Sequence, residues 1–251
     1  MRVFLHELRA QQRIFWRSRE AAFFSFLFPI LLLALIGSVY GDVEIDGTSA
    51  PTYLLVGLLG YGVAANAFAG LAITLVVRRE AGLLKRVRGT PLRPGTYLAA
   101  VIASTVLVIG LQVVAQLLLG VFALGADWPA RPALFVLAVV IGAAAFAALG
   151  MAITAVIRSA EGSSAVVNAV YLPMAILSGV FFSRQQLPAV LEAVSELLPL
   201  TYLLDLLRAS FVPGESFAPS AVAAVVVWGL VGMVVAVRMF RWEPREGMSG
   251  A

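Results

Sequence analysis

Cysteine is absent from this 251-residue sequence, and histidine occurs only once, at His6. The lack of cysteine excludes disulfide bonds and thiolate metal sites, and a single histidine excludes a histidine-rich metal cluster. Charged residues are also scarce, because they make up 13% of the chain, whereas soluble domains carry about 25%. With 61% hydrophobic residues, the composition indicates a membrane protein rather than a soluble domain.

The sequence also lacks the motifs of common catalytic and nucleotide-binding sites. A G-x-x-x-x-G-K-[ST] phosphate loop is missing, since the single lysine, Lys85, follows Leu84 rather than glycine. Metalloprotease, nucleophile-elbow and dinucleotide motifs are missing as well. The cores of the apolar blocks contain no charged residue, whereas an ion-coupled carrier or an intramembrane protease is expected to bury at least one. We therefore expect neither catalytic nor metal-binding residues in this chain, and no secondary transport.

Apolar residues are gathered in blocks of about twenty, the length of a helix that crosses a bilayer. We predict an all-α integral membrane protein with six transmembrane helices, forming a single domain over residues 1–251. The spans are expected at about residues 21–40, 53–77, 97–124, 133–157, 165–182 and 220–240.

Two amphipathic segments flank these spans. Residues 1–20 repeat large apolar side chains at helical spacing among arginines, which predicts a basic helix lying along the inner leaflet. Residues 183–219 are expected to form short external helices, interfacial or re-entrant, since residues 200–212 are apolar but too short to span.

The basic residues predict the orientation in the membrane. With this topology, fifteen of the eighteen lysines and arginines lie on one side, which the positive-inside rule assigns to the cytoplasm together with both termini. The other side has only Arg131, Arg184 and Arg208. The high isoelectric point, about 9.8, is then explained by topology and by contact with membrane lipids, and nucleic acid is not expected as a partner. Abundant Arg, Ala, Val and Gly suggest a bacterial source, hence the bacterial plasma membrane.

Residues 78–95, RREAGLLKRVRGTPLRPG, form a basic island between the second and third spans. We expect one or two turns of helix in it, ended by the Pro and Gly residues that follow. This helix would present Leu83, Leu84 and Val87 as an apolar stripe among charges. The pattern predicts a docking site for a cytoplasmic partner. The alternative is that the island is only a topology signal whose charges are solvated.

The island, RREAGLLKRVRGTPL over residues 78–92, resembles the first cytoplasmic loop of type-2 ABC exporter membrane subunits. A second segment, SGVFFSRQQLP over residues 178–188, resembles the fifth span and external helices of that family, as do LPLTY at 198–202 and LLR at 206–208. The motif order and the six-span topology agree with this family over nearly the whole chain. The local pattern is most similar to the bacterial drug- and antibiotic-export branch.

The resemblance implies that the island docks a coupling helix into a separate ABC ATP-binding subunit, present in two copies. The permease would form a homodimer, or a heterodimer with a related permease, and ATP and Mg²⁺ would bind only to the partner subunit, so that this chain binds no cofactor. The residues that would couple to the ATPase are Glu80, Gly82, Leu83, Leu84, Lys85, Arg86, Val87 and Arg88.

In that family the substrate path is lined largely by the second and fifth spans of the dimer. Packing between helices is the alternative role for each polar candidate, and we rank packing above contact with substrate. The candidates for the path are Asn66, Thr74, Gln112, Gln116, Asn168 and Tyr171.

The resemblance therefore predicts the permease subunit of an ATP-driven exporter of a hydrophobic or amphipathic substrate, such as a drug, antibiotic or natural product. Two alternatives stay open. One is an exporter of a lipid or a lipid-linked glycan. The other is a non-transporting scaffold or sensor that recruits a cytoplasmic protein through the island. A membrane enzyme acting on lipid is disfavoured by the missing catalytic residues.

Overall fold

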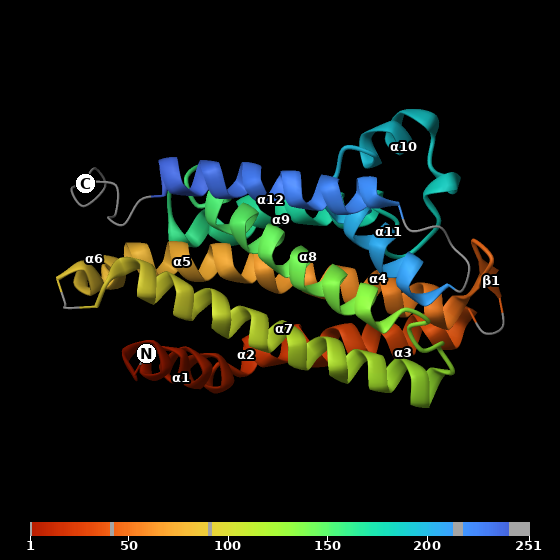
Figure 1. The fold of residues 1–251 in the computed structure, drawn as a ribbon, viewed down its shortest axis with the longest axis horizontal. Helices are drawn as coiled ribbons and strands as arrows, with labels where there is room; N and C mark the ends of the chain where they lie inside the picture. The colour runs from red at the N-terminus through yellow and green to blue at the C-terminus, as the bar shows by residue number, and fades with distance from the viewer. Residues whose placement is uncertain (1, 41–42, 90–91, 213–217, 241–251) are drawn as a thin grey trace.

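The computed structural model describes residues 2–40, 43–89, 92–212 and 218–240, with the side chains of Ala21, Ser38, Val39, Tyr40, Arg88 and Pro94 left out. The described chain is almost entirely helical, which confirms the predicted all-α membrane class. Its only strands, β1 (Glu44–Ile45) and β2 (Thr48–Ser49), form a two-residue antiparallel hairpin within the described ranges. The long helices lie side by side along one axis (Figure 1).

Five helical segments are long and apolar enough to cross a membrane. They are Ala50–Glu80, Gly95–Leu124, Pro132–Ile153, Ala160–Leu177 and Pro219–Met239. The predicted first span is also helical, because α2 (Arg19–Ala22), the π-helix η1 (Phe23–Leu27) and α3 (Phe28–Tyr40) follow one another without a break. Its strongly apolar part, Phe23–Gly37, is shorter than the other five, so the first predicted span, at residues 21–40, stays a prediction.

The first of these five segments is the centre of the bundle. It consists of α4 (Ala50–Ala64), the π-helix η2 (Ala65–Gly70) and α5 (Leu71–Glu80), and it is the most buried of the five. Helices α3, α7 (Pro94–Leu124) and α8 (Pro132–Ile153) pack against it. Small residues allow the close approach, since a Cβ added at Gly150 of α8 would lie 2.7 Å from two backbone oxygens of η2.

Several helices begin or end at other residues than predicted, because local sequence signals start or stop them. The span expected at 165–182 is α9 (Ala160–Leu177), which begins five residues earlier because the Ser159 side chain caps it by accepting a hydrogen bond from the Gly162 amide at 3.2 Å. It ends early as well, because Gly179 turns the chain with a φ of +81°. The fourth span, expected to reach 157, stops at Ile153, and the sixth is α12 (Pro219–Met239).

The predicted external segment contains the 3₁₀ turn η3 (Arg184–Gln186), α10 (Ala189–Ser195) and α11 (Pro199–Phe211). Helix α11 is inserted among α4, α8 and α12, with most of its side chains buried. Helix α10 instead stands at the margin of the bundle, and four apolar side chains on it and just after it are exposed (Figure 1). They are Val190, Leu191, Val194 and Leu197.

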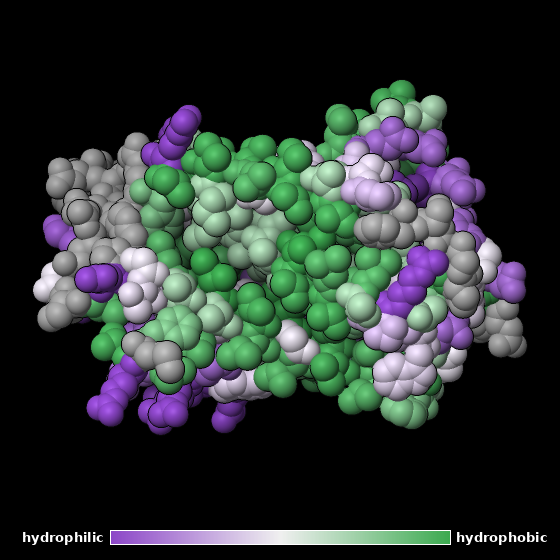
Figure 2. Space-filling view, in the orientation of Figure 1, coloured by the Kyte–Doolittle hydropathy of each residue, from purple (hydrophilic) through white to green (hydrophobic). Residues whose placement is uncertain are grey.

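The surface has the pattern of a membrane protein. Apolar side chains cover the middle of the molecule, and hydrophilic side chains gather at its two ends (Figure 2). One end holds the amphipathic helix α1 (Arg2–Arg17), the short helix α6 (Leu83–Arg88) and the last turn of α12 (Figure 1). The other end holds the β1–β2 hairpin, η3 and α10. This separation agrees with the predicted arrangement of the loops.

Candidate functional site

A short helix occupies the basic island, where the sequence predicts it. Helix α5 ends at Glu80, the chain turns at Ala81 and Gly82, and α6 follows at once. Gly82 has a φ of +68°, a left-handed conformation that glycine adopts without strain. The sharp turn therefore directs α6 away from the axis of the central helix at the end of the bundle. Thr90 and Pro91 of the island lie outside the described residues.

The three apolar residues expected to form one stripe on α6 do not all face the same way. Leu84 is fully buried in the core of this chain, and Val87 packs against the same core. Leu83 is 44% exposed, and the neighbouring Lys85 and Arg86 are exposed as well. The expectation that all three apolar residues face a partner is therefore wrong for Leu84, whose side chain anchors α6 to the bundle.

Arg79 holds the end of the central helix against the turn that follows α8. Its side chain is only 6% exposed. Nη1 donates to the carbonyl oxygen of Thr154 at 2.9 Å, and Nη2 donates to that of Ile157 at 2.7 Å. The planar guanidinium can reach both carbonyls at once, which a lysine ammonium does less well. Sequence reasoning counted this arginine only as a topology charge, because its partners lie 75 and 78 residues further along.

Glu80, the neighbour of Arg79, makes a further contact at the same end of the central helix. Its carboxylate accepts a hydrogen bond from the backbone amide of Ala160, the first residue of α9. A carboxylate at this position also interacts favourably with the positive end of the helix dipole. Two adjacent residues of α5 thus form hydrogen bonds with the turn after α8 and with the first residue of α9. We call this set of contacts, made by Arg79 and Glu80 with Thr154, Ile157 and Ala160, the junction.

The structure brings three of the candidate path residues together with a serine that the sequence did not single out. Ser25 Oγ donates to Asn66 Oδ1 at 2.7 Å, and Asn66 Nδ2 donates to Gln112 Oε1 at 2.6 Å. Gln112 Nε2 in turn donates to Gln116 Oε1 at 3.3 Å. This polar chain links η1, η2 and α7, and the two glutamines are fully buried. Each π-helix supplies one member, since its widened turn places a polar side chain toward its neighbour.

The other three candidates lie elsewhere. Tyr171 of α9 is buried, and its hydroxyl donates to the carbonyl oxygen of Tyr61 at 2.9 Å while the two rings lie 5.2 Å apart. Thr74 is half-buried on α5, and Asn168 is exposed on α9. Tyr171 and the polar chain thus form hydrogen bonds between helices, whereas Asn168 is exposed on this chain, and the role of all six residues in a substrate path stays a prediction.

These features define a class of protein: a multi-pass α-helical membrane protein that carries a short helix at one end of its central span. The model of the ABC-2 type transporter family matches residues 3–212, and the chain belongs to this family. No curated protein matches the chain. Members of the family are permease subunits of ABC transporters, which pair with an ABC ATP-binding subunit and have no ATPase site of their own.

Proposed function

We propose that this permease subunit belongs to an exporter, and that it moves a hydrophobic or amphipathic substrate such as a drug, antibiotic or natural product out of the cell. The cores of the spans are uncharged, and the polar chain joins four of their side chains by hydrogen bonds. Such an interior suits a substrate that is itself largely apolar. A lipid or a lipid-linked glycan satisfies the same chemistry and is the second candidate.

Helix α6 is the point at which the ATP-binding subunit acts. Its exposed face carries Leu83 together with the charged side chains of Lys85 and Arg86, so that an apolar anchor and two charges are available to a partner. Its other face is fixed by Leu84 in the core of the chain. A push on α6 is therefore transmitted to the bundle rather than absorbed by the short helix.

The junction is the observation that carries this proposal. Through Arg79 and Glu80, the end of α5 is attached to both the turn after α8 and the start of α9. A displacement of α6 by the partner then moves the second and fifth predicted spans together. In an exporter of this family that works by alternating access, these two spans line the path between two permease subunits. We place the complex in the plasma membrane, with both termini of this chain on the cytoplasmic side.

A pair of substitutions tests the role of α6. Leu83→Glu changes the exposed face, and we expect the affinity for the ATP-binding subunit to fall at least about tenfold, since an interface anchor often contributes 2 kcal/mol or more. Glu80→Gln leaves that face unaltered and weakens the junction, so we expect binding to persist while substrate-stimulated ATP hydrolysis falls.

The matched control for α6 is Lys85→Arg, which keeps both the charge and the exposure. Binding is measured by co-purification, and export by uptake into inverted vesicles. Normal binding and normal export by Leu83→Glu would exclude α6 as the docking helix. A wild-type permease that binds the ATP-binding subunit, while no substrate in a broad screen stimulates ATP hydrolysis, would favour the scaffold alternative.

A further inference from the structure

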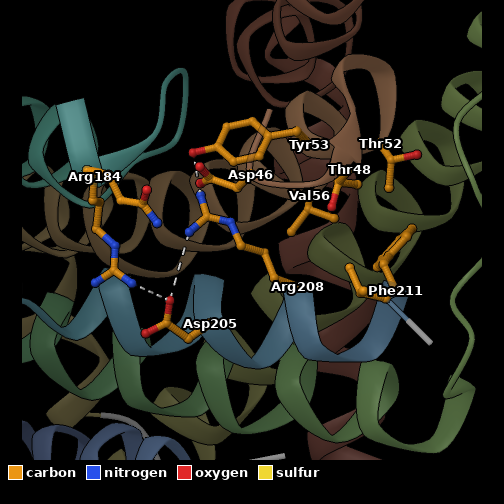
Figure 3. A pocket seen from close by; sticks show the side chains of 11 residues that line it. Asp46, Thr48, Thr52, Tyr53, Val56, Arg184, Asp205, Arg208 and Phe211 are labelled. Carbon is orange, nitrogen blue, oxygen red and sulfur yellow. Dashed lines mark hydrogen bonds and ion pairs between the residues drawn. The ribbon is translucent and has the colours of Figure 1, made fainter. Parts of the chain in front are cut away.

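A pocket of about 500 Å³ lies at the end of the bundle opposite to α6. Its walls come from four segments that are far apart in sequence: the β1–β2 hairpin, the first turns of α4, η3 and the second half of α11 (Figure 3). The path residues of the central bundle do not line it, and neither the family nor the proposed transport function assigns it a role. Its lining combines charged side chains with an apolar wall.

Two arginines converge on one carboxylate in this pocket. Arg184 Nη2 lies 2.8 Å from Asp205 Oδ1, and Arg208 Nη1 lies 3.8 Å from the same oxygen (Figure 3). Arg208 Nη2 also donates to the Gly179 carbonyl oxygen at 2.5 Å and to the Tyr53 hydroxyl oxygen at 2.9 Å. These contacts fix Arg208 against α4, with its guanidinium carbon 4.7 Å from the centre of the Tyr53 ring.

The donors in this cluster outnumber the acceptors. A guanidinium carries five N–H groups, and among the described residues Arg184 uses only Nη2, on Asp205. Its side chain remains 26% exposed, so the other donors are accessible from the pocket. The second carboxylate of the pocket, Asp46 in the hairpin, forms no ion pair with either arginine within the described ranges. The two arginines are matched in number by Asp46 and Asp205, and Glu192 and Glu196 line the adjoining hollow, so the observation that favours a ligand with acceptor oxygens is the set of open N–H groups on Arg184.

The placement of these arginines is not explained by topology. Among the described basic residues, only Arg131, Arg184 and Arg208 belong to this end of the bundle, and two of them line one pocket. The lining also includes the apolar side chains of Val56, Phe211 and Val212, which we call the apolar wall. An oxyanion that is attached to an apolar group would place its oxygens on the arginines and its carbon chain along this wall.

We propose that this pocket binds an oxyanion, a phosphate or a carboxylate, carried on an amphipathic molecule. Arg184 supplies the open donors, Arg208 completes the cationic pair, and Asp205 occupies the same donors when the ligand is absent. Removing the Asp205 charge should therefore strengthen binding, although this residue lines the pocket. If the network served only to hold η3 and α11 against α4, no anionic ligand would bind, and removal of the Asp205 charge would only lower the stability of the fold.

The test uses the purified full-length chain in maltoside detergent, which contains no phosphate or carboxylate. Octyl phosphate and octanoate are titrated by calorimetry, with octyl glucoside as the neutral comparison and inorganic phosphate as the free ion. We expect both anionic amphiphiles to bind and octyl glucoside not to compete. Tighter binding of octyl phosphate than of inorganic phosphate identifies an amphiphile site, whereas equal affinities identify free phosphate as the source of the oxyanion.

Variants decide whether binding occurs in this pocket. Arg184→Gln should weaken octyl phosphate binding about tenfold or more, because it removes the charged donors that would face the oxyanion. Asp205→Asn should tighten it. Arg131→Gln removes a charge at the same end but outside the pocket, and should change nothing. The proposal is overturned if the folded wild type binds neither amphiphile, or if Arg184→Gln, with an unchanged melting temperature, binds as tightly as wild type.

Discussion

Replacing Arg79 by alanine should loosen the connection between the central helix and α9 without changing the packing of the membrane spans elsewhere. In the structure the guanidinium is buried and donates to two carbonyl oxygens, those of Thr154 and Ile157. The substitution removes both hydrogen bonds at once. It also leaves the two carbonyl oxygens without these donors at a buried position.

The size of the effect follows from these two bonds. A hydrogen bond from a charged donor contributes about 1.5–3 kcal/mol, and a buried acceptor left without a partner costs a similar amount. Local rearrangement of the turn and entry of water reduce the sum, so we expect a loss of about 3 kcal/mol in the free energy of unfolding. Arg79→Lys keeps the charge, but its ammonium group satisfies the two carbonyls less well, and a loss of about 1 kcal/mol is expected.

Two measurements check this prediction. Unfolding of the purified chain in mixed micelles gives the free energy, and hydrogen exchange followed by mass spectrometry reports on the backbone amides around residues 154–162. Exchange should accelerate there in Arg79→Ala, because the turn after α8 loses its tie to α5. Peptides from α7 and α12 should keep the exchange rates of the wild type.

Arg86→Ala provides the control, since Arg86 is an exposed residue on α6 that lies seven positions away in a charged segment. It should change neither the free energy of unfolding nor the exchange of the turn. A stabilising role of Arg79 would be refuted if Arg79→Ala unfolded at the same denaturant concentration as wild type and exchanged at the same rate around residues 154–162.

Three further predictions concern other parts of the chain. Asn66→Ala breaks the polar chain between η1 and α7 and should lower stability by about 1–2 kcal/mol, as measured in the same micelles, with Asn168→Ala on the exposed face of α9 as a near-neutral control. Gly82→Ala places a Cβ at a φ of +68° and should lower stability by about 1 kcal/mol, whereas Gly95→Ala in α7 should not lower it. Burial raises the pKa of the Asp205 carboxyl, while Arg184 and Arg208 act in the opposite direction. The folded protein then holds this proton more tightly than the unfolded chain, so the contribution of Asp205 to stability decreases as the pH rises through the raised pKa. The melting temperature of wild type relative to Asp205→Asn should fall over that range, and a constant difference would contradict the assignment.

The sequence was sufficient to predict most of the architecture, because bilayer helices need long apolar segments and the composition makes these segments obvious. Five of the predicted spans are confirmed as long apolar helices, and α6 lies in the predicted island. The ends of the spans were less accurate. The Ser159 cap lengthens α9 at its start and Gly179 shortens it at its end, and such local signals are weak beside a strong hydropathy pattern.

The functional residues were harder to predict, because their contacts are distant in the sequence. The four-residue spacing of Gln112 and Gln116 correctly indicates one face of a helix, yet nothing in it shows that Asn66 and Ser25 continue the chain. The junction depends on partners about eighty residues away, and the pocket depends on four separate segments. A positive residue in a short loop is first read as a topology signal, and only the fold shows which arginine has a structural partner.

The central claim is that this permease converts the action of an ATP-binding subunit into export. The most direct measurement is to express the tagged chain with a candidate ABC ATP-binding subunit from the same genome, extract the proteins in mild detergent and determine the mass of the intact complex and its ATP hydrolysis. We predict an assembly of two permease subunits and two ATP-binding subunits that hydrolyses ATP and responds to an exported substrate. A chain that purifies without any nucleotide-binding partner under conditions that keep it folded would contradict the account.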